Sequence, residues 1–334
     1  MRIMVFDVAA SEGGALTILK HYYDEAVKDT QNQYIFVLSL PKFENTENVT
    51  VLNFPEVKKS WVKRLSFDRK VAPKLVKKYN ADEVLSLQDV IVPKVKIKQT
   101  LYLHQPLPFC VHKFSLFKDT KLWAYQNLIS KLIYKSVRKA DKVIVQTNWV
   151  KAACVEKIKA DPNKIVVELP KIDIKTTNEF IGTRETMSAF FYPANAARYK
   201  NHKVVVDACI NLKREKVNDY KVYFTLKGNE SKHISKLYKT CMEKELPIEW
   251  IGYVDPEDIY DYYARAILLF PSFLETLGLP LMEAKAVAAP VIASDLPFSR
   301  EVLGDYGNAE FFNYEDVKEL CRIMKRHITF SQKN

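Results

Sequence analysis

Apolar residues along this chain recur at two different spacings. Short, nearly continuous apolar runs such as Arg2–Asp7 predict buried strands, whereas Ala15–Lys28 carries apolar residues every three to four positions and predicts a helix. The first half repeats this alternation, with further strands expected at Tyr34–Ser39, Val49–Asn53, Leu101–His104 and Lys142–Gln146, and a long helical stretch over residues 119–139. Alternating strands and helices predict the α/β class, with parallel sheets covered by helices on both faces.

The alternation lapses once, near Glu168–Gly182, which has no clean period and contains a proline. We interpret this segment as an interdomain linker. A second set of strands follows it, expected at Ala189–Tyr192, Tyr220–Leu226, Ile248–Ile251, Ala266–Phe270 and Val291–Ala293. The pattern therefore predicts an N-terminal domain over residues 1–168 and a C-terminal domain over 183–314. A last helix, within 315–334, is expected to pack toward the N-terminal domain.

The composition narrows the classes of function. A chain of 334 residues, 48% of them hydrophobic, is long enough for two full cores. Its net charge of +11 favours an anionic partner: a phosphate-bearing substrate, nucleic acid or an acidic membrane surface. The five cysteines are scattered, which predicts free thiols in the cytoplasm and no zinc site. No apolar run approaches the roughly 20 residues that span a bilayer, and the start of the chain is interpreted as a strand rather than a signal peptide.

The pair Glu275 and Glu283 is the most informative feature of the sequence. A turn that contains Gly278 and Pro280 separates the two carboxylates, and the apolar strand Ala266–Phe270 precedes them. In open α/β sheets, ligands bind at the carboxyl ends of the strands. The amides of a helix N-terminus suit phosphate, and carboxylates accept hydrogen bonds from hydroxyl groups. Phosphate on amides together with hydroxyls on carboxylates describes a nucleotide sugar.

Three weaker features accompany this pair, and each has a plainer interpretation. Gly13 and Gly14, between the first strand and helix, let the backbone approach a phosphate or sugar, or simply form a tight turn. His104 ends a strand and faces the predicted cleft, or is satisfied by a backbone carbonyl. Arg198 and Lys200 follow the first strand of the second domain, where they neutralise a diphosphate or form a solvated basic loop.

A basic stretch over residues 57–80 has one acid, Asp68, and interleaved apolar residues such as Trp61. It predicts contact with an anionic membrane surface, although a solvated helix face explains the same charges. Binding of nucleic acid is not expected, because no recognition module accompanies the stretch. The residues assigned to the membrane are Lys58, Lys59, Lys63, Arg64, Lys70, Lys74, Lys77 and Lys78. Phe109, Phe114, Phe117, Lys113, Lys118 and Trp123 extend the same surface.

Together these residues resemble the retaining glycosyltransferases of family 4, the "glycosyl transferases group 1". The strongest matches are Phe270-Pro271-Ser272 to Glu283-Ala284, then residues 290–294, then Arg300-Glu301-Val302-Leu303. The run His104-Gln105-Pro106-Leu107-Pro108-Phe109 is similar to members encoded with bacterial capsule or exopolysaccharide genes. The resemblance covers nearly the whole chain. It implies the GT-B fold, in which two Rossmann-like β/α/β domains face a central cleft.

The resemblance also implies roles for single residues. Glu275 would contact hydroxyls of the donor sugar, and Glu283 would hold the ribose hydroxyls. Lys200 would bind the diphosphate, and His104 is counted with Glu275 and Lys200 as catalytic. The family's arginine position falls near Asn195, a departure for which Arg198 is the expected substitute. The other residues assigned to the donor are Gly13, Gly14, Tyr253, Val254, Thr276, Leu277, Gly278 and Leu279.

The implied activity is that of a retaining, metal-independent hexosyltransferase without a cofactor. It would move a hexose from a nucleoside-diphosphate sugar to a lipid-linked glycan, at the inner face of the cell membrane, in surface polysaccharide biosynthesis. Two alternatives stay open. A GT-B epimerase would carry further acid/base carboxylates. A catalytically silent GT-B subunit would bind a partner enzyme, and the departure at Asn195 favours it.

Overall fold

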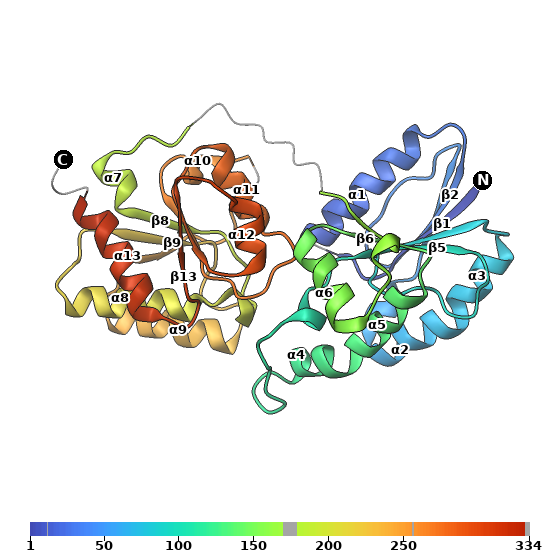
Figure 1. Ribbon diagram of the computed structural model, residues 1–334, viewed down its shortest axis with the longest axis horizontal. Coiled ribbons are helices and arrows are strands. Elements are labelled where there is room, and N and C mark those ends of the chain that lie inside the picture. The colour runs from blue at the N-terminus through green and yellow to red at the C-terminus, as the bar shows by residue number, and fades with distance from the viewer. Residues whose placement is uncertain (12, 170–178, 256, 331–334) are drawn as a thin grey trace. The chain divides into compact units, whose positions relative to one another are not determined.

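The computed structural model describes residues 1–11, 13–169, 179–255 and 257–330, and the chain divides into two compact units (Figure 1). Unit 1 is Met1–Lys171 and unit 2 is Ile172–Asn334. The division falls inside the predicted linker, of which residues 170–178 lie outside the described part of the chain. Each unit has its own parallel sheet, as the alternation of strands and helices predicted.

The sheet of unit 1 has seven parallel strands in the order β3-β2-β1-β4-β5-β6-β7. The interior strand β1 pairs in register with both neighbours, Met4 with Ile35 on one side and with Val84 on the other. The strands are β1 (Arg2–Asp7), β2 (Gln33–Leu38), β3 (Val49–Asn53), β4 (Glu83–Ser86), β5 (Lys98–Leu103), β6 (Lys142–Val145) and β7 (Ile165–Val167).

Successive residues of β1 enter opposite layers of the unit 1 core, because side chains alternate between the two faces of a strand. Met4 and Phe6 pack with Val76, whereas Val5 packs with Leu19. Both faces are therefore buried under helices (Figure 1). The helices are α1 (Gly13–Lys28), α2 (Trp61–Ser66), α3 (Ala72–Lys78), α4 (Thr120–Ala124), α5 (Ser130–Lys139) and α6 (Asn148–Ile158). One π-helical turn joins α2 to α3 and another joins α4 to α5, at Phe67–Val71 and Tyr125–Ile129.

The sheet of unit 2 has six parallel strands in the order β10-β9-β8-β11-β12-β13, and the four residues of β11 are all buried. The strands are β8 (Ala189–Tyr192), β9 (Lys221–Phe224), β10 (Ile248–Trp250), β11 (Ile267–Phe270), β12 (Val291–Ser294) and β13 (Ala309–Phe312). The helices are α7 (Arg184–Met187), α8 (His202–Arg214), α9 (Lys232–Glu243), α10 (Ile259–Tyr263), α11 (Leu279–Ala286), α12 (Pro297–Leu303) and α13 (Val317–Phe330).

Helix α13 contains most of the predicted last helix, and it packs against α8 within unit 2. Its predicted packing toward the N-terminal domain stays a prediction. Three strands were not expected from the sequence: β4, β7 and β13. They have only three or four residues each, so their apolar runs are too short to stand out, and their pairing with neighbouring strands defines them. Among the described residues, no helix is both long and apolar enough to cross a bilayer.

Candidate active site

Two loops of unit 2 meet where neighbouring parallel strands end. β8 and β11 lie side by side, so residues 193–201 and 271–278 leave the sheet at the same edge. The amide of Phe273 donates to the carbonyl of Tyr199 at 2.9 Å, and the Ser272 hydroxyl oxygen lies 3.1 Å from the same carbonyl oxygen. These bonds hold together two segments that are about 70 residues apart in the chain.

Lys200 and Glu275 form an ion pair between these loops. The Lys200 Nζ lies 2.5 Å from Glu275 Oε1, and the two side chains are only 14% and 15% exposed. The Ser272 hydroxyl, which is fully buried, donates to the same Oε1 at 2.6 Å. A single carboxylate oxygen is thus bound by a cation and a hydroxyl at the carboxyl ends of the strands. The structure brings together two of the three residues predicted to be catalytic.

The backbone that carries Lys200 is held on both sides. The buried Tyr192 hydroxyl donates to the Lys200 carbonyl, and burial raises the pKa of Tyr192 well above its usual value. Asn201 has a left-handed φ of 58°, and its amide group donates to the carbonyls of Pro271, at 3.3 Å, and Tyr314, at 2.8 Å. Asparagine tolerates this backbone conformation better than most residues do. The position of the Lys200 ammonium is therefore built into the fold.

The N-terminus of α11 follows the Glu275 loop directly. Gly278 has a φ of +81°, and a Cβ at this position would lie 3.1 Å from Leu281 and 3.3 Å from Phe270. A side chain is excluded there, so the turn needs glycine. Among the described residues no side chain caps this helix, Pro280 lacks an N–H, and the Leu281 amide donates to the Gly278 carbonyl at 2.9 Å, so a ligand at this end would meet the amide of Leu279. The predicted donor residues Thr276, Leu277 and Leu279 belong to the same turn.

Glu283 projects from α11 one turn further on. Its Oε2 accepts a hydrogen bond from the Tyr263 hydroxyl at 2.7 Å, and Tyr263 is fully buried. Burial raises the pKa of Glu283, and the Tyr263 bond opposes that effect. In the described part of the chain, the Tyr263 hydroxyl is the one donor to this carboxylate. The fold therefore orients one oxygen and leaves the other as an acceptor.

The remaining predicted donor residues of unit 2 follow the same edge of the sheet. Tyr253 and Val254 come after β10, and the Tyr253 side chain is 75% exposed. Arg198 is exposed at the start of a short 3₁₀ turn. Asn195 uses its side-chain oxygen to accept the amide of Ala197 at 3.1 Å, so it shapes the loop and supplies no positive charge.

Unit 1 carries a second group of polar residues at the carboxyl ends of its strands. Asp7 ends β1 and is completely buried, and its Oδ1 accepts the amide of Ala10 at 2.9 Å. Its Oδ2 is buried without a hydrogen-bond partner among the described residues. Burial raises the pKa of Asp7 to about 7. Gln88 follows β4, and its side-chain oxygen accepts the amide of Val8 at 3.2 Å.

Asp89 and His104 belong to the same group. Asp89 has a left-handed φ of 64°, and its Oδ1 accepts the backbone amides of His104, at 2.7 Å, and Gln105, at 3.0 Å. Burial raises the pKa of Asp89 and lowers the pKa of His104. The His104 ring stacks near Tyr102, with centroids 4.5 Å apart, and its Nε2 is buried without a partner in the described chain. A neutral imidazole with one unpaired nitrogen suits a hydroxyl group.

The loop before α1 is tied to the basic stretch. Gly13 and Gly14 were expected between the first strand and helix, but α1 begins at Gly13, so both belong to its first turn, where a Cβ on Gly14 would meet open space. The Lys58 ammonium donates to the Ala9 carbonyl and to the Ser11 hydroxyl, at 3.2 Å for the latter. Arg64 is likewise engaged inside the unit, since its Nε lies 2.8 Å from Asp68 and its side chain is 17% exposed. Two of the eight cations assigned to a membrane therefore have partners within unit 1.

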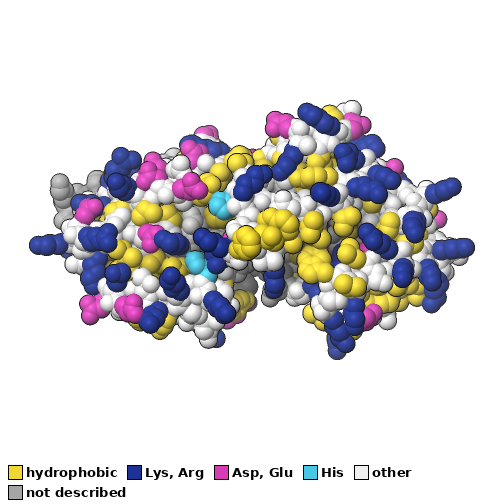
Figure 2. Space-filling model, turned by 90° about the horizontal axis from the view of Figure 1, so that it is seen from below, with side chains coloured by type: hydrophobic (Ala, Val, Ile, Leu, Met, Phe, Trp, Pro, Cys, Tyr) yellow, Lys and Arg dark blue, Asp and Glu magenta, His cyan; other side chains and the backbone are white. Residues whose placement is uncertain are grey.

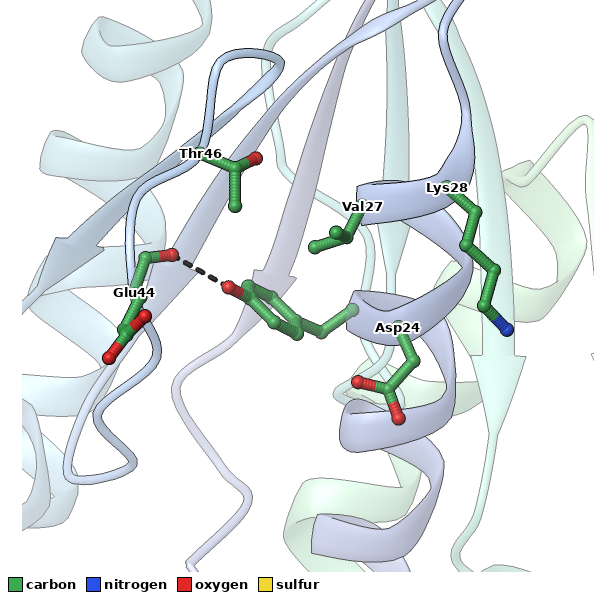
Figure 3. Close-up of a pocket in the computed structure, with 6 residues that line it drawn as sticks. Asp24, Val27, Lys28, Glu44 and Thr46 are labelled. Atoms are coloured by element: carbon green, nitrogen blue, oxygen red, sulfur yellow. Dashed lines mark hydrogen bonds between the residues drawn. The ribbon is translucent and has the colours of Figure 1, made fainter.

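A shallow pocket on unit 1 lies away from these residues (Figure 3). It is formed by the second half of α1 and the segment before β3, near the amino ends of the strands. The Tyr23 hydroxyl donates to the Glu44 carbonyl at 2.8 Å, which closes one side of the pocket. Asp24 and Glu44 line it with carboxylates, which do not suit a phosphate. Among the described residues, no group of three or more His, Cys, Asp or Glu side chains could hold a metal ion.

Comparison with known proteins decides the family. Residues 173–331 match the family model described as "Glycosyl transferases group 1". Unit 2 of this chain belongs to that family. The matched residues include Lys200, Glu275 and Glu283, and the turn between the two glutamates.

Two curated relatives share much of the chain. One is an uncharacterised 41.2 kDa protein in the cps region of Klebsiella pneumoniae, 27% identical over 65% of this chain and 60% of its own length. The chain thus spans less than two thirds of that relative. Another is a processive diacylglycerol alpha-glucosyltransferase of Acholeplasma laidlawii, 27% identical over 61% of this chain and 67% of its own length. O-antigen chain mannosyltransferase B of Escherichia coli is 43% identical over a shorter piece, 18% of this chain and 16% of its own.

Solved structures match the whole architecture. Sucrose-phosphate synthase from Thermosynechococcus elongatus has a TM-score of 0.77 at 15% identity, over 99% of this chain and 90% of its own. Anabaena HepE in complex with UDP-glucose has a TM-score of 0.68 at 14% identity, over 100% of this chain and 91% of its own. At such identities the likeness concerns the fold. The predicted class, GT-B with two Rossmann-like units, is confirmed.

Several residues of the unit 1 and unit 2 polar groups were not identified as site residues from the sequence. Ser272, Tyr263 and Tyr192 act through hydrogen bonds to residues that were predicted. Asp7 is the last residue of a predicted strand, and that placement was the available signal for it. Asp89 comes shortly after β4, which was not predicted, so no strand marked it.

Proposed function

We propose that this protein is a retaining hexosyltransferase that uses a nucleoside-diphosphate sugar. The observation that carries this proposal is the Lys200–Glu275 pair, 2.5 Å apart, beside the uncapped N-terminus of α11. A cation and the amides at a helix N-terminus suit a diphosphate, while carboxylates on the same turn and helix suit sugar hydroxyls. A fold relative binds UDP-glucose, which supports the same class of donor here.

Each residue has a role in this proposal. Lys200 and the amides of residues 276–279 bind the diphosphate, Glu275 accepts hydroxyls of the transferred sugar, and Glu283 accepts those of the ribose. Tyr253 and Val254 line the base, Arg198 supplies the second cation, and Gly13 and Gly14 let the backbone approach the donor. His104, neutral because burial lowers its pKa, binds a sugar hydroxyl.

The reaction needs no nucleophile from the protein. The bond between the anomeric carbon and the phosphate oxygen breaks, and the acceptor oxygen bonds to that carbon from the same face. The acceptor proton passes to the departing phosphate. Lys200 and the α11 amides stabilise the charge that grows on that phosphate, which is the task a metal would otherwise perform.

The acceptor is proposed to be a lipid-linked glycan of a surface polysaccharide, met at the inner face of the membrane. Relatives named for O-antigen mannosyl transfer and for glucosyl transfer to diacylglycerol support such acceptors. The anionic membrane remains the proposed partner of the basic stretch. Its exposed lysines are Lys58, which bonds within unit 1, and Lys59, Lys63, Lys70, Lys74, Lys77 and Lys78.

A screen of nucleoside diphosphates and nucleotide sugars by thermal shift tests the proposal. A ligand at 100 times its Kd should stabilise the protein by about 2.7 kcal/mol, and one base should stand out. The matching nucleotide sugar, incubated with the protein, should then release the diphosphate slowly by transfer to water. A protein that no nucleotide stabilises would refute the proposal.

A catalytically silent subunit is the second candidate, because Asn195 shapes its loop where the family resemblance implies a cation. Such a subunit would bind a nucleotide without turning it over. Replacing Asn195 with Arg should raise donor affinity in an enzyme that lacks one cation, and should create no turnover in a silent subunit.

A further inference from the structure

Unit 1 displays large apolar side chains to solvent on one surface. We call these residues the apolar tip: Trp61, Val62, Val111, Leu116, Phe117 and Leu128. Phe117 is 94% exposed, Val111 is 90% exposed and Val62 is 77% exposed. Single exposed apolar residues are ordinary, but a group of them indicates an interaction site. Figure 2, seen from the side of α2 and α4, shows hydrophobic side chains gathered on this face among Lys and Arg.

Hydrogen bonds and packing within unit 1 fix the segments that carry the tip. The Gln126 amide group donates to the His112 carbonyl at 2.7 Å, and its oxygen accepts the Phe114 amide at 3.2 Å. Phe114 is buried, so the loop is anchored between the exposed Val111 and Phe117. Trp61, from α2, meets the ring of Tyr125 edge-on with centroids 6.0 Å apart. Hydrogen bonds and packing thus bring two distant segments to one surface and turn their largest side chains outward.

The charge around the tip is mostly positive. Residues 107–131 contain a single acid, Asp119. The exposed cations among and beside the tip residues are Lys63, Lys113, Lys118, Lys121 and Lys131. Apolar side chains ringed by lysines match the boundary of an anionic bilayer, where acyl chains lie beneath negative headgroups. A protein that bound the tip instead would need an apolar surface surrounded by acidic residues.

We propose that the apolar tip inserts into the interface of an anionic membrane, with Val111 and Phe117 entering deepest and the lysines at the headgroups. This inference rests on the proposed function and refines it. It moves the main contact from the cations of the basic stretch, of which Lys58 and Arg64 are engaged inside unit 1, to the apolar tip. The lipid that carries the acceptor would then be met at this surface.

Flotation of the full chain with vesicles of phosphatidylglycerol and phosphatidylcholine tests the proposal. The double variant Val111→Ser/Phe117→Ser should lower the partition coefficient by about tenfold or more, since binding scales with buried apolar area. The control is Val27→Ser/Met242→Ser, which removes two other exposed apolar side chains and should float like the parent. Lys58→Gln should also float like the parent.

Tryptophan fluorescence gives a second measurement. Trp61 lies in the tip, so brominated lipids should quench its emission in the parent and less in the double variant. The Trp61→Phe variant identifies the part of the emission that comes from Trp61.

Equal flotation of the parent and the double variant overturns the proposal. Vesicle binding lost together with a change from dimer to monomer in light scattering also overturns it, because a second copy would then cover the tip. Nucleotide stabilisation is measured on the same variants: its absence in the parent refutes the proposed function, whereas its persistence in a variant that no longer floats leaves that function intact.

Discussion

The polar groups of the two units lie at equivalent places, the carboxyl ends of parallel strands. Those of unit 2 include an ion pair, whereas burial in unit 1 favours uncharged side chains. In unit 2, Lys200 and Glu275 keep opposite charges in contact beside a helix N-terminus. In unit 1, burial favours the uncharged forms of Asp7, Asp89 and His104, since it raises the pKa of both acids and lowers that of the imidazole.

The difference matches the two kinds of ligand that a glycosyl transfer requires. A diphosphate needs fixed positive charge, which unit 2 supplies. Sugar hydroxyls are neutral, so besides a carboxylate they also suit donors and acceptors without net charge, such as a protonated carboxyl and a neutral imidazole. The same strand-end geometry therefore serves either ligand, and the surrounding burial selects between them. Four predictions test this contrast.

The largest effect is expected for Lys200→Met. Charge that develops on the departing phosphate would lose its cation, and turnover should fall roughly 10²–10³-fold, or about 2.7–4 kcal/mol in the barrier. Single-turnover rates with the donor identified by thermal shift measure it. Lys203→Met is the matched control, because Lys203 pairs with Asp207 on the exposed face of α8. If Arg198→Met abolishes turnover while Lys200→Met leaves it unchanged, the phosphate contact is misplaced.

A pH effect is expected next, from Asp7. Its pKa is about 7 in the folded protein and about 3.8 when unfolded, so the unfolded chain binds fewer protons between these values. Stability should therefore fall as the pH rises from 4 to 7, with Asp7 contributing on the order of 2–3 kcal/mol. Urea unfolding of the parent and of Asp7→Asn across this range measures it, with the exposed Asp24→Asn as the control. Parallel curves for the parent and Asp7→Asn would contradict the prediction.

Glu283→Ala should weaken binding of the free nucleoside diphosphate by roughly 1.5–3 kcal/mol, the range for hydrogen bonds to a charged group. Isothermal titration measures it. Tyr263→Phe keeps the carboxylate and removes its 2.7 Å hydrogen bond, so it should cost less than Glu283→Ala. Glu275→Gln should hardly change this affinity but should lower turnover. Unchanged affinity in folded Glu283→Ala would exclude Glu283 as the ribose ligand.

The smallest effect is expected for Ser272→Ala. Loss of the 2.6 Å hydrogen bond to Glu275 should slow turnover by about fivefold, near 1 kcal/mol, with little change in diphosphate affinity. Ser299→Ala is a sharp control, because Ser299 is equally buried and its hydroxyl has no partner among the described residues. A conservative Ser272→Thr should restore part of the rate. Equal rates for the two alanine variants would mean that Glu275 needs no positioning by Ser272.

The sequence by itself determined much of this protein. Apolar runs and helical spacings are local, so they predicted the two parallel sheets, and the turn at Gly278 and Pro280 placed Glu275 and Glu283 on one strand–turn–helix unit. Lys200 was also found, as a cation after a strand. These features depend on neighbours within a few residues, which a linear pattern records.

The tertiary structure decided the rest. Lys200 meets Glu275 because β8 lies beside β11, and no local pattern encodes that order of strands. Burial of Asp7 and the engagement of Lys58 with the loop before α1 likewise depend on segments about 50 to 80 residues apart. Hydrogen bonds and desolvation act through space, so the charge state of a strand-end residue is set by whatever the sheet order places around it.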